Sequence, residues 1–286
     1  MGRIAYYVFQ IKKMSYDDLS FAVRLTQESD WGLSEDDFRF MMELEPDGCF
    51  MLLEDSEKIG VATNVSFGDV AWFGNLTVDE EYRGKGAGSL LVKHSLDYLV
   101  GKKVKTVGLY AYLDKVQFYR KLGFRYDSEF LVLKGKGFES PTASSVELMR
   151  SDDLPKVTEF DAACFGASRV KSLEPILLDP DNLCYVNAEH GRVLGFAVAK
   201  VYKGMAELGP VACSQTDGNV AVELVKAVLG RLKSVGVSTC VSAKASAIVD
   251  MLVGLGFRES FRVARMFYGP LAGTECICIA ESLERG

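Results

Sequence analysis

Three glycines at alternate positions mark the segment of this chain best suited to chemistry. Gly84, Gly86 and Gly88 stand in residues 76–91, LTVDEEYRGKGAGSLL, between a strand-like run and an amphipathic run. Glycines let backbone N–H groups converge on an anion, and a following helix adds its free N-terminal amides and the positive end of its dipole. Arg83 and Lys85 add positive charge. The segment therefore predicts a phosphate-binding turn.

The spacing of the glycines separates this turn from two other phosphate motifs. A P-loop requires GxxxxGK followed by Ser or Thr, and a Rossmann fingerprint requires GxGxxG, whereas the glycines here are spaced GxGxG. Residues 83–88, RGKGAG, resemble instead the R/Q-x-x-G-x-G/A signature of the GNAT-superfamily (Gcn5-related) N-acetyltransferases.

A second segment resembles the same family independently. Residues 118–124, FYRKLGF, are similar to its FYxKLGF closing segment and follow the turn at the expected distance of about 30 residues. The resemblance covers residues 4–135. It implies acetyl-CoA as co-substrate, a primary amine of a small molecule or peptide as acceptor, and direct attack without a protein-bound acyl intermediate. The alternative is a non-catalytic acetyl-CoA or CoA sensor that contacts a partner.

The resemblance also implies roles for particular residues. The backbone of the predicted strand at Leu76 to Val78 would pair with the pantetheine arm, and the N–H of Leu76 or Val78 would polarise the thioester carbonyl. Tyr119 matches the family tyrosine that protonates the departing thiolate. The residues expected to contact the cofactor are Leu76, Thr77, Val78, Arg83, Gly84, Lys85, Gly86, Ala87, Gly88, Ser89 and Asp114.

The sequence departs from the family pattern at two positions. Residues 71–78, AWFGNLTV, contain no carboxylate to deprotonate the amine. Asn75 and Thr77 alternate onto one strand face and are suited to hold a relay water, while the distant carboxylates of Glu28, Asp30 and Glu54 stay open as alternatives. Tyr112 replaces the family asparagine that bonds the pantetheine arm. Asp114 is expected to substitute for it.

The candidates for contacts with the acceptor are Trp31, Asn75, Arg169 and Arg265. Trp31 lies in the loop after the first predicted helix, where the family often builds its acceptor pocket, although a core role is the alternative. Arg169 and Arg265 are suited to pair with an anionic acceptor, with an ordinary ion pair as the alternative for each.

Periodicity predicts an α/β (α+β) order of strands and helices in both halves. The resemblance then implies two GNAT-like domains, each a mixed, mostly antiparallel twisted sheet flanked by helices. A glycine- and serine-rich stretch predicts domain limits at 1–136 and 146–286 with a linker at 137–145. The halves repeat, because Gly60, Gly74 and the pair Gly123-Phe124 recur as Gly195, Gly209 and the pair Gly256-Phe257.

The second half lacks the glycine turn. Residues 214–219, SQTDGN, stand in its place with one glycine and no basic residue, and Pro210 removes a strand N–H donor. We therefore expect this half to bind coenzyme A poorly. It serves either as a structural partner of the first half or as a wall of the acceptor pocket.

Composition excludes several classes of protein. A net charge of −6 and a pI near 5.2 argue against nucleic-acid and anionic-membrane partners. Neither an export signal nor a membrane-spanning stretch is apparent, so a cytoplasmic enzyme is expected. Seven scattered cysteines without a CxxC pair and only two histidines predict no disulfide framework and no metal site.

Overall fold

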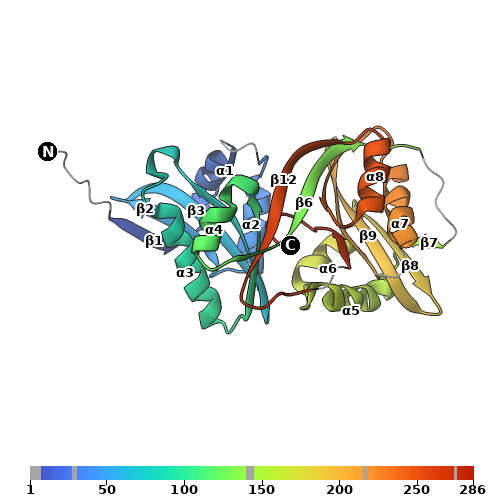
Figure 1. Ribbon diagram of the computed structural model, residues 1–286, viewed down its shortest axis with the longest axis horizontal. Coiled ribbons are helices and arrows are strands. Elements are labelled where there is room, and N and C mark those ends of the chain that lie inside the picture. The colour runs from blue at the N-terminus through green and yellow to red at the C-terminus, as the bar shows by residue number, and fades with distance from the viewer. Residues whose placement is uncertain (1–7, 28–30, 140–144, 215–217, 274–275) are drawn as a thin grey trace. The chain divides into compact units, whose positions relative to one another are not determined.

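The computed structural model describes residues 8–27, 31–139, 145–214, 218–273 and 276–286. The chain divides into two compact units, one running to Val107 and including Arg285, the other running from Gly108 to Glu284 and including Gly286. Figure 1 labels many of their elements. None of the helices in these described ranges combines the length and apolar character needed to cross a membrane.

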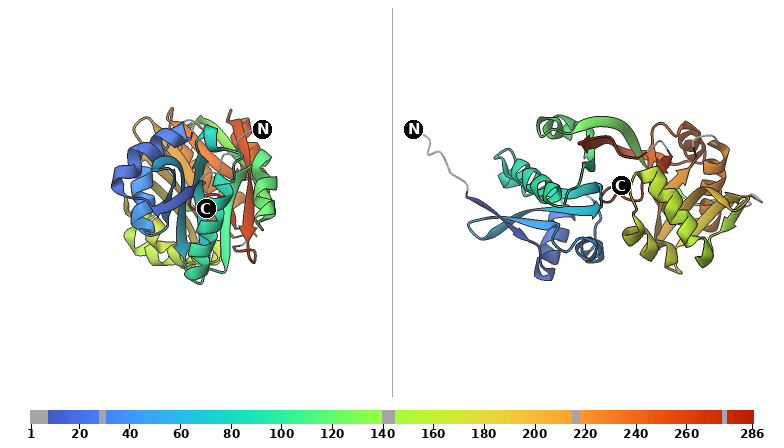
Figure 2. Two further views of the ribbon diagram at one scale, coloured as in Figure 1. Left: turned by 90° about the vertical axis from the view of Figure 1, so that its left-hand side faces the viewer. Right: turned by 90° about the horizontal axis from the view of Figure 1, so that it is seen from below.

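The first unit is built on four antiparallel strands in the order β1-β2-β3-β4. Figure 2 shows α3 on one face of these strands and α1 and α2 on the other. The elements of this unit are β1 (Phe9–Lys13), α1 (Leu19–Gln27), α2 (Glu35–Leu44), β2 (Cys49–Glu54), β3 (Glu57–Phe67), β4 (Val70–Val78), α3 (Ala87–Gly101) and the start of β5 (Thr106–Tyr112).

A buried carboxylate ties α3 to the rest of the first unit. Glu45, which ends α2, accepts a hydrogen bond at Oε2 from the backbone N–H of Ser66 on β3 (2.9 Å). Its Oε1 accepts from the Tyr98 hydroxyl (2.6 Å) and from Lys102, at the C-terminal end of α3. Burial and this bond to Glu45 raise the pKa of Tyr98. The network fixes the helix whose N-terminus follows the glycine turn.

A second buried carboxylate, Asp18, closes the entry to α1. Its Oδ2 accepts from the N–H and hydroxyl of Ser15, both at 2.9 Å, and its Oδ1 pairs with Lys58 (2.6 Å) and Lys12 (3.1 Å). Burial alone would raise the pKa of Asp18, but the hydrogen bonds from Lys58, Ser15 and Lys12 outweigh it, so the pKa lies well below its usual range.

Asp18→Asn is therefore expected to lower the free energy of unfolding by about 1–2 kcal/mol at neutral pH. Because the folded pKa lies below the unfolded value of about 3.9, this contribution is present above about pH 4 and is lost as the pH falls further. Denaturant titrations of both proteins at pH 7 and pH 3 measure the difference. An equal difference at both pH values would contradict the assignment.

The second unit holds one sheet in the order β5-β12-β6-β11-β13-β10-β9-β8-β7, with β5 taking part from Gly108 on. Its further elements are α4 (Val116–Lys121), β6 (Arg125–Lys136), β7 (Val146–Leu148), α5 (Leu154–Phe165), α6 (Val170–Leu178), β8 (Leu183–Glu189), β9 (Arg192–Tyr202), β10 (Met205–Cys213), α7 (Gly218–Arg231), β11 (Gly236–Ser242), α8 (Ser246–Gly254), β12 (Arg258–Tyr268) and β13 (Ile277–Ile279).

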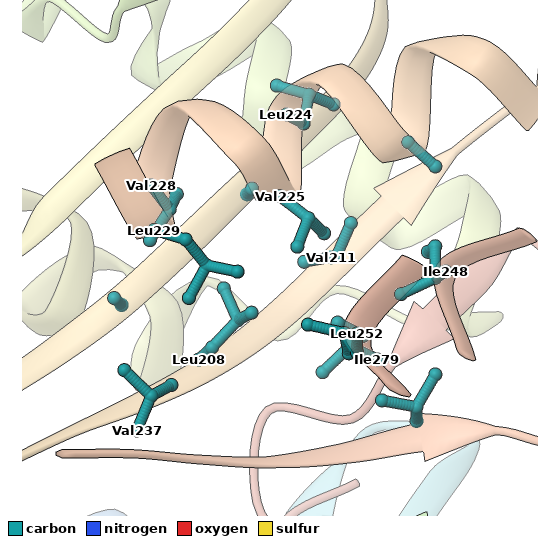
Figure 3. Close-up of a cluster of buried hydrophobic side chains, with 14 of the residues drawn as sticks. Leu208, Val211, Leu224, Val225, Val228, Leu229, Val237, Ile248, Leu252 and Ile279 are labelled. Carbon is teal, nitrogen blue, oxygen red and sulfur yellow. The ribbon is translucent and has the colours of Figure 1, made fainter. Parts of the chain in front are cut away.

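Alternating residues of β9 enter two different cores. Ala197 and Ala199 pack in a cluster with α7 and α8, part of which is drawn in Figure 3. Phe196 and Val198 pack in a second cluster with α5 and α6. Since successive side chains of a strand point to opposite faces, helices cover this sheet on both sides. The predicted α/β fold class is thus confirmed.

The last strands of the two sequence halves are interleaved. β6 lies between β12 and β11, and it is antiparallel to both. β12 in turn separates β5 from β6. The compact units consequently divide at 107/108, inside the first repeat, whereas the predicted limits at 136 and 146 refer to the sequence repeat and stay a prediction. Of the predicted linker, Gly137 and Phe138 bond to Val235 and Leu229, while 140–144 lie outside the described residues.

Candidate functional site

The strand that leads to the glycine turn contains a bulge. Thr63 of β3 pairs with Gly74 of β4, but Val61, two residues earlier, pairs with Thr77, so β4 holds one extra residue. Asn75 adopts a left-handed conformation there, with φ of 52°. A bulge of this kind bends a strand and redirects its side chains and N–H groups.

The bulge gathers three buried polar side chains. Asn75 Nδ2 donates to Thr63 Oγ1 at 3.1 Å. The Asn75 amide oxygen and the Thr77 hydroxyl are buried and have no hydrogen-bond partner among the described residues. Buried polar groups are rarely left in this state, so these two atoms are available to a ligand or water. The sequence singled out Asn75 and Thr77 by their alternation, but it missed Thr63, because β3 also contains the polar residues Asn64 and Ser66 and nothing in the sequence distinguishes Thr63 from them.

The turn after β4 is shaped by its glycines. Gly84 has φ of 75° and Gly86 has φ of 92°, both in the left-handed region that favours glycine. A Cβ atom on either would meet nothing within 4 Å, so it is the backbone conformation that requires glycine here. Both residues are exposed to solvent. The turn thus leaves its backbone open to a ligand.

The helix that follows presents free amides to this turn. α3 begins at Ala87, and its first intrahelical contact is from the N–H of Leu90 to the carbonyl of Gly86 (3.0 Å). The N–H groups of Ala87, Gly88 and Ser89 precede this contact and have no intrahelical acceptor. They combine with the helix dipole to make a corner that favours an anion.

The two cations of the turn lie beside it in different ways. Arg83 folds back, and its Nε donates to the Val78 carbonyl at 2.8 Å, which fixes the strand end to the turn. Lys85 is exposed, with its Nζ 5.3 Å from the centre of the Tyr82 ring. A hydrogen bond from Tyr82 to Glu54 raises the pKa of that tyrosine. The side chain of Glu54, the last residue of β2, therefore lies beside Tyr82, which directly precedes the glycine turn. Glu28 and Asp30 lie outside the described residues.

Two further predicted residues belong to the second unit. Tyr119 lies on α4 and is only 8% exposed, with its ring against Phe118 (centroids 4.9 Å apart) and Phe124 (5.7 Å). Burial raises its pKa, so its hydroxyl is protonated at neutral pH. Asp114 is exposed and pairs with Lys115 at 2.6 Å. Their roles stay predictions.

Besides Asn75, the candidates for acceptor contacts are Trp31, Arg169 and Arg265, and they lie in different surroundings. Trp31 is half-buried, and its backbone N–H donates to the Thr26 carbonyl at 3.4 Å. Arg169 is buried, and its Nε and Nη2 bond both oxygens of Asp161 at 3.1 and 2.8 Å. Arg265 is 14% exposed and bonds Asp127 at 2.8 Å. An anionic acceptor would have to displace a carboxylate from either arginine.

Among the described residues, the cysteines and acidic side chains form no second centre. None of the seven cysteines takes part in a disulfide. In the ranges that the structure describes, no group of three or more His, Cys, Asp or Glu side chains is arranged to hold a metal ion. The bulged strand, the glycine turn and the start of α3 are thus the chemically suited site of the first unit.

Fold and site together define an α/β protein built on a repeated strand–turn–helix unit. A family model described as "Acetyltransferase (GNAT) family" matches residues 14–124, and another described as "Acetyltransferase (GNAT) domain" matches residues 157–275. The two matches leave only the ends and the region between them uncovered. The chain belongs to the GNAT superfamily and carries two GNAT domains in tandem.

Individual proteins that are similar to this chain are also named as acetyltransferases. An uncharacterized N-acetyltransferase of Methanocaldococcus jannaschii is 26% identical over 34% of this chain and 46% of its own length, so the match spans less than half of that relative. An uncharacterized N-acetyltransferase of Bacillus subtilis is 20% identical over 71% of each chain. The solved structure of a Pyrococcus horikoshii protein assigned to the acetyltransferases has the same fold, with a TM-score of 0.80 at 17% identity over 100% of this chain and 99% of that one.

Proposed function

We propose that this chain is an N-acetyltransferase that moves the acetyl group of acetyl-CoA to a primary amine by direct attack. The observation that carries the proposal is the turn of residues 83–89, where two left-handed glycines and the free amides of α3 make an anion-binding corner. Because the net charge of the chain is negative, a diphosphate would be attracted by a local anion site of this kind and not by the overall charge. The acceptor is a small-molecule or peptide amine.

The residues present fit acetyl-CoA along the strand as well as at the turn. The backbone of Leu76, Thr77 and Val78 would hold the pantetheine arm, and a strand N–H redirected by the bulge would polarise the thioester carbonyl. Acetyl-CoA supplies the activated acyl group. Tyr119, whose raised pKa keeps it protonated, would donate a proton to the departing thiolate.

Neutral oxygens take the place of the missing strand carboxylate. The buried amide oxygen of Asn75 and the hydroxyl of Thr77 lack partners among the described residues, and each has the chemistry to accept a hydrogen bond. We assign them to orient the acceptor N–H or a water that removes its proton. The lack of a carboxylate on β4 also favours the second candidate function, a non-catalytic acetyl-CoA sensor.

Gly86→Val tests the cofactor site. A β-branched residue at φ of 92° is strained by about 1–2 kcal/mol, so the turn should change shape and coenzyme A affinity should fall about tenfold or more. Gly68→Val is the matched control, since Gly68 also has a left-handed φ, of 83°, and open space around it, but lies in the β3–β4 turn. Calorimetry with coenzyme A gives both affinities. Unchanged binding in the Gly86 variant would refute the site.

The acceptor class needs a separate experiment. Polyamines, amino acids, aminoglycosides and peptides with free N-termini are offered with acetyl-CoA, and the release of free thiol is followed. Turnover with one class supports the enzyme and defines its acceptor. Tight binding of acetyl-CoA without turnover on any amine supports the sensor.

A further inference from the structure

The two halves share the strand bulge at equivalent positions. Gly60 and Gly195, like Gly74 and Gly209, are 135 positions apart. With this offset the pair Asn64–Phe73 in β3 and β4 corresponds to the pair Ala199–Leu208 in β9 and β10. Shortly beyond these pairs the register shifts in both halves, with one extra residue in β4 and one in β10. The strand residues 76–78 of the first half therefore correspond to residues 211–213 of the second.

Residues 211–213 are already bonded, by the chain's own C-terminal segment. β10 and β11 are parallel partners only as far as the pair Leu208–Thr239. Beyond it β13 lies between them and is antiparallel to both, with Ile279 opposite Val211 on one side and Val241 on the other. The Cys213 N–H donates to the carbonyl of Cys276 at 2.9 Å.

The inserted segment is held on both faces of the sheet. Ile279 is fully buried in the core that contains Leu252 and α7, as Figure 3 shows. Ile277 is buried in the opposite core with α5 and α6. A buried ion pair then anchors the chain beyond β13, since Lys200 Nζ bonds both the carboxylate (2.7 Å) and the backbone carbonyl (2.8 Å) of Glu281.

One glycine is matched to this segment. A Cβ atom at Gly209 would lie 2.0 Å from the carbonyl oxygen of Ala280, so β10 admits the segment only because this residue has no side chain. The N–H of Ala280 donates to the carbonyl of Cys240 on β11 at 3.0 Å. Residues 276–281 are therefore built into the gap between β10 and β11.

We propose that residues 276–281 are an internal occupant of the strand edge that the acyl-CoA arm uses in the first half. An extended peptide satisfies the same strand N–H and carbonyl groups that an amide-containing pantetheine arm would satisfy. The C-terminal GNAT domain therefore holds its own chain instead of a cofactor, and the protein binds one acyl-CoA per chain. The equivalence of the two edges rests on the proposed function; the occupancy of the second edge does not.

Hydrogen exchange of the full-length chain, with and without coenzyme A, tests the inference. Backbone amides of residues 211–213 and 276–280 should exchange slowly and be unchanged by coenzyme A, which should protect residues 76–89 with a stoichiometry of one. Fast exchange of 276–280 without ligand, a change there on adding coenzyme A, or two bound molecules per chain would overturn the inference. No protection of 76–89 refutes the proposed function instead, while slow exchange of 276–280 still supports the internal occupant.

Variants make the test more specific. Gly209→Ala should speed exchange of residues 276–280 at least tenfold, because its methyl group takes the space of the Ala280 carbonyl. Gly204→Ala is the matched control, since Gly204 has a left-handed φ of 85° but open space around it. Lys200→Met, which removes the anchor of Glu281, should act in the same direction as Gly209→Ala. Unchanged exchange in both would contradict the inference.

Discussion

Arg169→Leu is expected to lower the free energy of unfolding by about 3–5 kcal/mol, because it leaves the carboxylate of Asp161 buried without its partner. Both residues are at most 1% exposed, and the guanidinium holds both carboxylate oxygens. It also donates to the carbonyl of Gly286 and lies 4.1 Å from the centre of the Phe165 ring. Denaturant titration of each variant measures the loss.

Two controls separate this expectation from a role in acceptor binding. Arg262→Leu breaks an exposed pair with Glu259 and should change the free energy of unfolding by less than about 1 kcal/mol. Combining Asp161→Leu with Arg169→Leu removes the stranded charge and should recover part of the loss. A stable Arg169→Leu protein with a raised KM for the acceptor would instead support the substrate contact considered from the sequence.

The order of elements in each half could be read from the sequence. The hydrophobic pattern indicates strands at 49–54 and 71–78 and a helix at 86–100, and these agree with β2, β4 and α3 within one residue. These segments have complete hydrophobic periods and clear ends. Serine is a favoured residue type at helix N-caps, and Ser34 caps α2, since its side chain accepts from the N–H of Asp37.

Pairing between distant strands could not be read in the same way. The apolar alternation of β6 is the same whether it pairs with strands of its own half or with β11 and β12. Periodicity identifies the face that is buried but not the neighbour that covers it. For the same reason a three-residue strand at 277–279 gives no sign that it enters the gap between β10 and β11.

Some features of the candidate site could likewise be predicted from the sequence, and others could not. The glycine turn was predictable, because left-handed backbone at Gly84 and Gly86 requires a particular residue type. The bulge at Asn75 was not, since it depends on the register between β3 and β4. The ion pair of Arg169 was equally hidden, because Asp161 lies eight residues earlier on α5, whereas Arg169 directly precedes α6.

Tyr119→Phe is expected to reduce acetyl transfer about tenfold or more while coenzyme A affinity stays the same. The substitution removes one hydroxyl and keeps the ring that packs against Phe118 and Phe124. Since burial raises the pKa of Tyr119, the wild-type hydroxyl stays protonated beyond its ordinary pKa of about 10. Loss of the acid form should therefore not limit the wild-type rate between pH 6 and about pH 10.

Steady-state kinetics on the amine found in the screen, with calorimetry for coenzyme A, distinguish the two candidate functions. Tyr126→Phe is the matched control, because Tyr126 is 41% exposed on β6, and it should keep both rate and affinity. A fall in rate confined to the Tyr119 variant would identify Tyr119 as the proton donor and support the enzyme over the sensor. Equal rates in wild type and Tyr119→Phe would remove this tyrosine from the chemistry, since the thiolate would then take its proton from another donor.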